Sequence, residues 1–99
     1  MSNSLIVQAI RERRKLQFIY HGKMRLVDPH VFGVSTKNHE VILSWQTGGS
    51  SSKPHDLPNW RMFETHEIHG LQMTNINFVP QSQHHNPFHS DIHTTYAAV

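Results

Sequence analysis

Arg25 and Arg61 are the side chains in this 99-residue sequence that are best suited to bind an anion. A guanidinium offers two parallel N–H donors to a phosphate and stays charged at every relevant pH. Asp28 and Glu64 lie close to these arginines in the sequence, so a local ion pair is the alternative role of each. Anion binding and ion pairing both stay open on the sequence alone.

Several aromatic side chains near the arginines could stack on nucleic-acid bases, which contributes about 1–3 kcal/mol per base. These aromatic residues are Tyr20, Trp45, Trp60 and Phe63. Core packing is the alternative and is expected for the tyrosine and the phenylalanine, whereas the two tryptophans border a polar loop and suit either role. His30 and Gln46 could add hydrogen bonds, although each taken singly is better explained as an exposed turn residue. The candidate ligand-binding or nucleic-acid-binding set is Tyr20, Arg25, His30, Trp45, Gln46, Arg61 and Phe63.

Positive charge is concentrated near the start of the chain, although the net charge is only +2. Of the nine Lys and Arg residues, six lie within residues 1–30, together with only two acids. These cations are Arg11, Arg13, Arg14, Lys15, Lys23 and Arg25. A basic end of the fold would attract a phosphate-bearing partner, and a solvated helix face is the equally weighted alternative.

Ten histidines are the most unusual feature of the composition. His85, His89 and His93 would line one face of a helix beside His84 and Asp91, where zinc or nickel could bind. No other ligand spacing supports such a site, so we expect a polar tail, no metal and no cofactor. A pH response is another use of imidazoles, which gain charge as the pH falls through about 6.5.

Catalytic motifs are missing from the sequence, including G-x-S-x-G, the P-loop and H-E-x-x-H. Residues 50–52 are serines near His55 and Asp56, but the members of a catalytic triad meet through the fold and not through sequence adjacency. The chain contains no cysteine, so it has neither a nucleophilic thiol nor a disulfide. We therefore expect a binding protein and not an enzyme.

One short helix followed by about five short strands is predicted to position these side chains. Apolar residues at helical spacing follow the capping residues Ser2, Asn3 and Ser4 and predict a helix of about ten residues. Asp28–Pro29 should end the second strand, because proline has no backbone N–H to donate to a neighbouring strand. The strand patterns fall at 16–20, 24–27, 41–45, 60–63 and 76–79, with a short extended piece at 31–34 and a Gly/Ser loop at 47–54.

A sheet this small would leave both faces in water if it were flat, so the predicted fold is mainly β, a small Sm-like or SH3-like barrel. The barrel with its helix should occupy residues 1–80. Residues 81–99 form a histidine-rich C-terminal tail in this interpretation. There, Phe88, Ile92 and Tyr96 recur every four residues and predict a short amphipathic helix that docks on the barrel.

Three segments, taken in order, resemble the WYL domain family. Residues 9–20 (AIRERRKLQFIY) are similar to the family's short basic-ended helix and its L-x-F-x-Y strand. Residues 25–33 resemble its R-x-V-x-P strand, and residues 60–68 resemble its R-x-F-x-x-x-x-I segment. The similarity extends over about residues 5–80.

The resemblance implies an Sm-like barrel that senses a ligand or binds nucleic acid or nucleotides, usually within bacterial transcription regulators. The family is thought to bind such anions through basic and aromatic residues. No helix-turn-helix precedes the predicted barrel, so we expect a free-standing copy. Expected partners are a nucleic acid or nucleotide-like anion, a second copy in a homodimer, or a regulatory protein. The alternative function is a protein-interaction or homo-oligomerisation domain without a small ligand.

The N-terminal segment does not have the pattern of a signal peptide, because no basic residue precedes the brief apolar stretch at 5–7. No run approaches the roughly 20 apolar residues of a membrane helix. We therefore expect a cytoplasmic protein without membrane contact.

Overall fold

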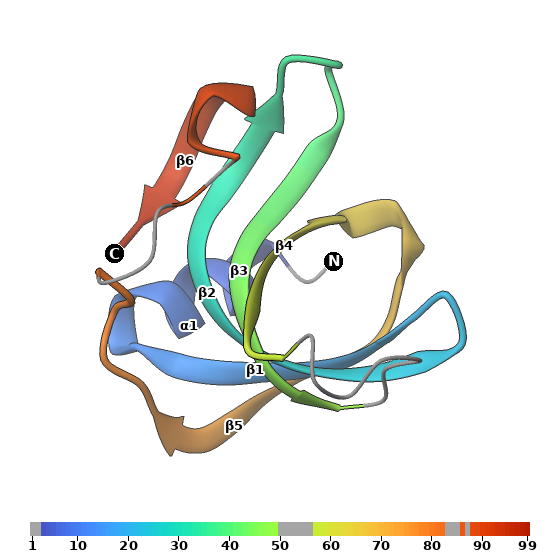
Figure 1. The fold of residues 1–99 in the computed structure, drawn as a ribbon, viewed down its shortest axis with the longest axis vertical. Coiled ribbons are helices and arrows are strands. Elements are labelled where there is room, and N and C mark those ends of the chain that lie inside the picture. Colours follow the sequence, from blue (N-terminus) through green and yellow to red (C-terminus); the bar gives the residue numbers. More distant parts are fainter. Residues whose placement is uncertain (1–2, 50–56, 83–85, 87) are drawn as a thin grey trace.

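The computed structural model describes residues 3–49, 57–82, 86 and 88–99, and shows a mainly β fold with one short α-helix (Figure 1). The helix, α1 (Asn3–Glu12), buries Ile6, Ala9 and Ile10, which are at most 1% exposed. This helical spacing of apolar residues places one side of α1 against the sheet, as the sequence predicts. The described helices include none long and apolar enough to cross a membrane.

The sheet is antiparallel and has six strands, one more than the sequence predicts. Its main order is β4-β3-β2-β1-β5, and β6 also pairs with β2. The strands are β1 (Arg14–Tyr20), β2 (Lys23–Ser35), β3 (Glu40–Gly49), β4 (Asn59–Glu64), β5 (Ile68–Asn77) and β6 (Ile92–Ala98). A single three-residue helical turn, η2 (Thr65–Glu67), joins β4 to β5.

Strand β2 continues through Pro29, where the sequence predicts a strand end. Its first part pairs with β1 as far as Val27, and its second part pairs with β6 from Val31 onward. Pro29 lies between these two partners, and the register with β3 shifts between Pro29 and Val31. An irregularity of this kind accommodates the missing amide hydrogen of proline and lets the strand bend.

The C-terminal residues form strand β6, so the predicted amphipathic helix is wrong. The edge of β2 beyond the end of β1 is open to a new partner, and residues 92–98 pair with it. Phe32 on β2 packs edge-on against Tyr96, with the ring centroids 5.3 Å apart. Because residues 92–98 belong to the same sheet as β2, they are not a separate tail.

The helical histidine face predicted in the tail does not form either. His93 lies on β6, in an extended backbone. The backbone is therefore not a continuous helix over residues 85–93, and helical spacing does not apply to it. His84 and His85 lie outside the described residues.

The long strand β5 replaces the short strand predicted at 76–79. It ends at Asn77, after which the backbone N–H of Phe78 donates to the carbonyl of Arg13 at 2.8 Å. Phe78 is 8% exposed, although it lies outside the strand.

Two apolar clusters occupy opposite faces of the central strands. The main cluster packs α1 against the sheet and includes Phe18, Tyr20 and Phe63. The second cluster contains Leu43, Trp45 and Trp60. Alternation along β3 and β4 explains the division, because neighbouring residues of a strand point to opposite faces. The core role expected of Tyr20 and Phe63 is therefore seen in the structure.

Candidate anion-binding site

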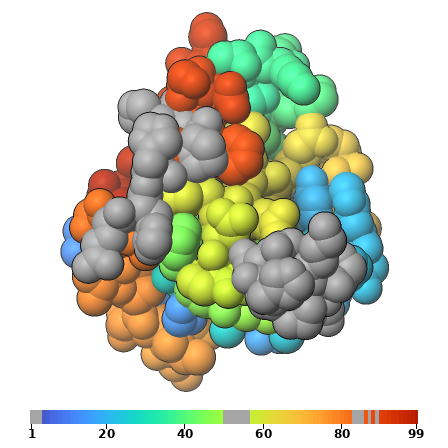
Figure 2. Space-filling model, viewed as in Figure 1, coloured from blue at the N-terminus to red at the C-terminus, as the bar shows by residue number. Residues whose placement is uncertain are grey.

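Arg25 and Arg61 lie on one face of β2, β3 and β4. Arg61 is directly opposite Ser44 on β3, so these two side chains share a face. Gln46, two residues further along β3, lies on the same face and accepts a hydrogen bond from Nη1 of Arg25 at 3.5 Å. Figure 2 shows β4, in yellow-green, exposed at the middle of one side of the molecule.

The two guanidiniums influence each other electrostatically. Burial, and after it the positive charge of Arg61, lowers the pKa of Arg25. Like charges that are held together in a partly buried place destabilise one another. The fold therefore places two like charges on one face of the sheet, where each opposes the other.

Aromatic rings support the guanidinium of Arg25. Its central carbon lies 5.8 Å from the ring centroid of Tyr20 and 5.8 Å from that of Phe63. Nη2 also donates to the backbone carbonyl of Tyr20 at 3.3 Å. These contacts hold the cation against the two aromatic rings, whose quadrupoles attract positive charge.

Gln46 is fully buried and uses both ends of its amide. Oε1 accepts from Arg25, and Nε2 donates to the carbonyl of Gly48 at 3.1 Å. The donation to Gly48 fixes which end of the amide is oxygen, so an acceptor faces Arg25. The alternative that Gln46 is an exposed turn residue is therefore wrong.

All the buried side-chain polar atoms that lack a hydrogen-bond partner, within the described part of the chain, lie on this face. They are Nε of Arg25, Oγ of Ser44 and Nε of Arg61. A buried polar atom without a partner costs about 1–3 kcal/mol. Such atoms call for an explanation, and the burial of both Nε atoms means that an anion would be reached by the other N–H groups of the two guanidiniums.

The ion pairs that could neutralise the two arginines are made with other residues. Asp28 accepts from Nζ of Lys15 at 2.7 Å, and Glu64 contacts Nδ1 of His39. Over residues 3–49, 57–82, 86 and 88–99, no carboxylate forms an ion pair with Arg25 or Arg61. Local ion pairing, the alternative role of the arginines, is therefore not what the structure shows.

Trp45 does not share the face of the arginines. It lies between Ser44 and Gln46 on β3, so its side chain points to the opposite face. There it packs against Trp60, with the ring centroids 5.2 Å apart, and both are at most 7% exposed. These two rings are core residues and not free platforms for bases.

His30 also lies apart from the arginines and has a structural role. Its Nε2 accepts from the backbone N–H of Gln81 at 2.9 Å, so the ring proton is on Nδ1 and is donated to the carbonyl of Asp28 at 2.7 Å. The ring packs against Trp60 and Phe78. His30 thereby anchors the segment that follows β5.

Burial lowers the pKa of His30 below its ordinary value. The unfolded chain therefore binds a proton more readily than the folded chain, and His30 destabilises the fold as the pH falls through about 6.5. We expect wild type to lose more free energy of unfolding than His30→Gln between about pH 7.5 and about pH 5.5. Urea unfolding at several pH values measures this difference. His93→Gln, at an exposed position on β6, should keep the wild-type pH dependence.

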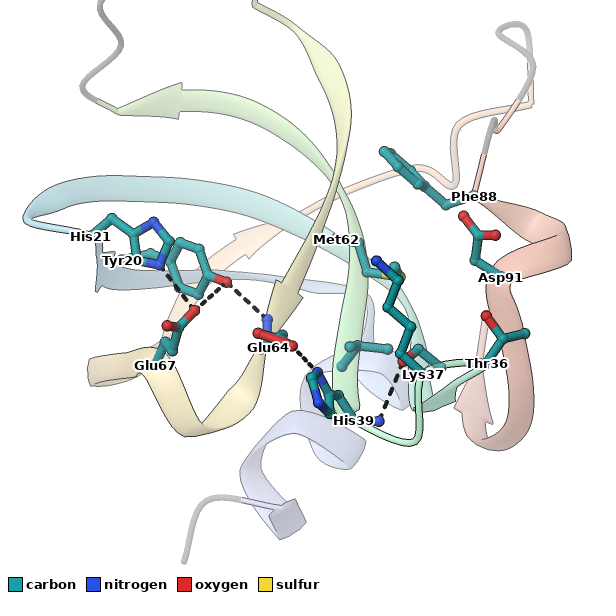
Figure 3. A pocket seen from close by; sticks show the side chains of 12 residues that line it. Tyr20, His21, Thr36, Lys37, His39, Met62, Glu64, Glu67, Phe88 and Asp91 are labelled. Carbon is teal, nitrogen blue, oxygen red and sulfur yellow. Dashed lines mark hydrogen bonds and ion pairs between the residues drawn. The ribbon is translucent and has the colours of Figure 1, made fainter.

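A pocket of about 540 Å³ opens at a different place and was not foreseen from the sequence (Figure 3). Its lining includes Tyr20, His21, His39, Glu64 and Glu67, which come from separate turns and strand ends. Hydrogen bonds from His21 and then from Tyr20 lower the pKa of Glu67, and burial raises the pKa of Tyr20. The spacing Glu-x-His-Glu at 64–67 is the only sequence signal that points to this place.

No protein-family model, no curated protein and no solved structure matches this chain. The resemblance to the WYL family therefore stays a prediction. The functional argument depends on the geometry of the residues described above.

Proposed function

We propose that this chain is a non-catalytic binding module for nucleic acid or a nucleotide-like anion, with Arg25 and Arg61 as its phosphate contacts. The observation that carries this proposal is the pair of neighbouring guanidiniums, each with a buried and unpartnered Nε and neither in an ion pair with a described carboxylate. A phosphate bound by both guanidiniums would relieve their repulsion and give their N–H groups an acceptor.

Recognition at this site depends on the phosphate and not on the bases. Tyr20 and Phe63 are at most 9% exposed and pack edge-on against each other, with the ring centroids 5.0 Å apart. Tyr20 also stacks on His21 at 4.3 Å. These rings have no free face for a base, and they hold Arg25 in place instead. We therefore expect binding that tolerates different base sequences.

The fold and the cellular role belong to the same proposal. We assign the antiparallel sheet to the Sm-like or SH3-like barrels, the fold implied by the resemblance to WYL domains, although its end strands β4 and β5 are not paired with each other over the described residues. Ligand sensing in bacterial transcription regulation, in the cytoplasm, is the role that the same resemblance implies. Phosphate binding by Arg25 and Arg61 does not depend on the family assignment.

Fluorescence anisotropy with a labelled single-stranded oligonucleotide of mixed sequence tests the proposal. We expect the logarithm of the affinity to fall with the logarithm of the salt concentration, with a slope of about −0.7 for each phosphate contact. Mononucleotides and inorganic phosphate should compete. If neither the oligonucleotide nor a mononucleotide panel binds at low salt, the proposal is wrong.

Gln46→Glu is expected to weaken oligonucleotide binding by at least about tenfold, because it places a carboxylate against the guanidinium of Arg25 and supplies the missing anion internally. Anisotropy measures the affinity, and circular dichroism checks that the sheet is retained. The matched control is Gln17→Glu on β1, a half-buried position, since the described hydrogen bonds of Arg25 go to Gln46 and Tyr20 and not to Gln17. Equal affinities of the two variants would contradict the role of Arg25.

A further inference from the structure

A second cluster of chemically active side chains lies where three connections of the sheet meet. Glu64 ends β4, and His66 and Glu67 belong to η2. His39 comes from the turn between β2 and β3, and His21 from the turn between β1 and β2. One ligand atom from each of Glu64, His66 and Glu67 lies within 4.8 Å of the other two. Figure 3 shows the side chains of Glu64 and Glu67 approached by His39 and His21.

Each carboxylate of this cluster is held through one oxygen. Oε2 of Glu67 accepts from the hydroxyl of Tyr20 at 3.0 Å and contacts Nε2 of His21 at 2.9 Å. Oε1 of Glu64 contacts Nδ1 of His39. The hydrogen bonds among described residues do not engage Oε2 of Glu64, Oε1 of Glu67 or the ring nitrogens of His66. Orientation of ligand carboxylates by hydrogen bonds is typical of metal sites.

We propose that Glu64, His66 and Glu67 bind one divalent transition-metal ion, with Zn²⁺ as the representative ion. An imidazole and two carboxylates are ordinary zinc ligands, at about 2.0–2.2 Å from the metal. Two carboxylates also neutralise the charge of the ion. Small rotations, above all of the exposed His66, must shorten the separations between the ligand atoms, and the hydrogen bonds leave the second oxygen of each glutamate available.

The pocket next to the cluster gives the ion further coordination positions. Glu64 and Glu67 both line this pocket, which holds about 540 Å³. A site with three protein ligands keeps a position open for water or for another ligand. This metal site differs from the histidine-rich segment singled out in the sequence, and its ligands are different residues from the arginines of the anion site.

Calorimetric titration of the full chain, prepared without an affinity tag, with Zn²⁺ at neutral pH tests the proposal. We expect one ion per chain, and His66→Asn and Glu67→Gln should each weaken binding by at least about tenfold. The control variant replaces the four histidines of the C-terminal segment, and it should bind as wild type does. That control carries asparagine at His84, His85, His89 and His93.

Imidazole nitrogen chemical shifts provide a readout that does not depend on affinity. On addition of Zn²⁺, the resonances of His66 should shift, whereas those of His93 should not. Circular dichroism checks that each variant keeps its strands. Wild-type affinity in folded His66→Asn would overturn the proposal, as would loss of binding in the control variant or no binding by wild type.

Discussion

Replacing Arg61 by glutamine is expected to weaken oligonucleotide binding by about tenfold to a hundredfold, and Arg25→Gln should do the same. A hydrogen bond between charged groups contributes about 1.5–3 kcal/mol, and each 1.4 kcal/mol corresponds to a tenfold change in affinity. Glutamine keeps much of the length and the polarity of arginine but loses the charge and the paired donors. Fluorescence anisotropy measures the loss.

The same substitution should leave the free energy of unfolding of the unliganded protein unchanged or raise it. Arg61→Gln removes a buried Nε without a partner and relieves the repulsion on Arg25. A structural arginine would show the opposite result, since its loss would destabilise the fold. Urea unfolding of Arg61→Gln beside wild type separates the two roles.

Arg11→Gln is the matched control for the arginine variants, because Arg11 is an exposed cation on α1. It lowers the net charge by the same amount and should change the affinity little. The salt slope of Arg61→Gln should be smaller by about 0.7, whereas that of Arg11→Gln should equal that of wild type. If both variants lose the same affinity, overall charge and not the site controls binding.

Phe18→Ala is expected to lower the free energy of unfolding by about 3–5 kcal/mol. Phe18 is 1% exposed in the main cluster and lies edge-on to Phe63, with the ring centroids 5.0 Å apart. Removing the ring leaves a cavity next to Tyr20 and Phe63, the two rings that contact Arg25. Because domains of this size are stable by only about 5–15 kcal/mol, this one change removes a large part of the total.

Ile19→Ala on the same strand is the control for this second prediction. Ile19 is 40% exposed and points to the face opposite Phe18, so its loss should cost much less. Chemical denaturation of both variants gives the comparison. Similar losses at the two positions would show that the face of β1 that carries Phe18 is not the main core.

Local sequence patterns were enough to predict much of the fold. Leu16, Phe18 and Tyr20 alternate with exposed or half-buried neighbours, and β1 contains all of them. The apolar run at 41–45 lies within β3, and residues 60–63 lie within β4. Alternation within one strand needs no knowledge of its neighbours, so the sequence alone reveals it.

Features that depend on distant segments could not be predicted in this way. The spacing of Phe88, Ile92 and Tyr96 suits a helix, but the open edge of β2 beyond β1 favours a strand there. The bend at Pro29 likewise depends on β1 and β6 sharing one edge of β2. Tertiary pairing decides both cases.

The candidate site divides in the same manner. Arg25, Gln46 and Arg61 come together because the strand registers align them, but Trp45 occupies the opposite face. Because side chains alternate along a strand, the sequence shows that Trp45 and Gln46 face opposite sides of the sheet. Only the pairing of the strands shows which side holds the arginines. The contact of Glu64 with His39 joins residues far apart in the sequence, so no local pattern predicts it.

Tyr20 contacts both candidate sites at once. Its carbonyl accepts from Arg25, whereas its hydroxyl donates to Glu67 and accepts from the backbone N–H of Glu64. If the ligands of both sites restrained this tyrosine, each would change the affinity for the other by the same factor. One residue at the end of β1 thus joins the two places, through its backbone carbonyl on one side and its hydroxyl on the other.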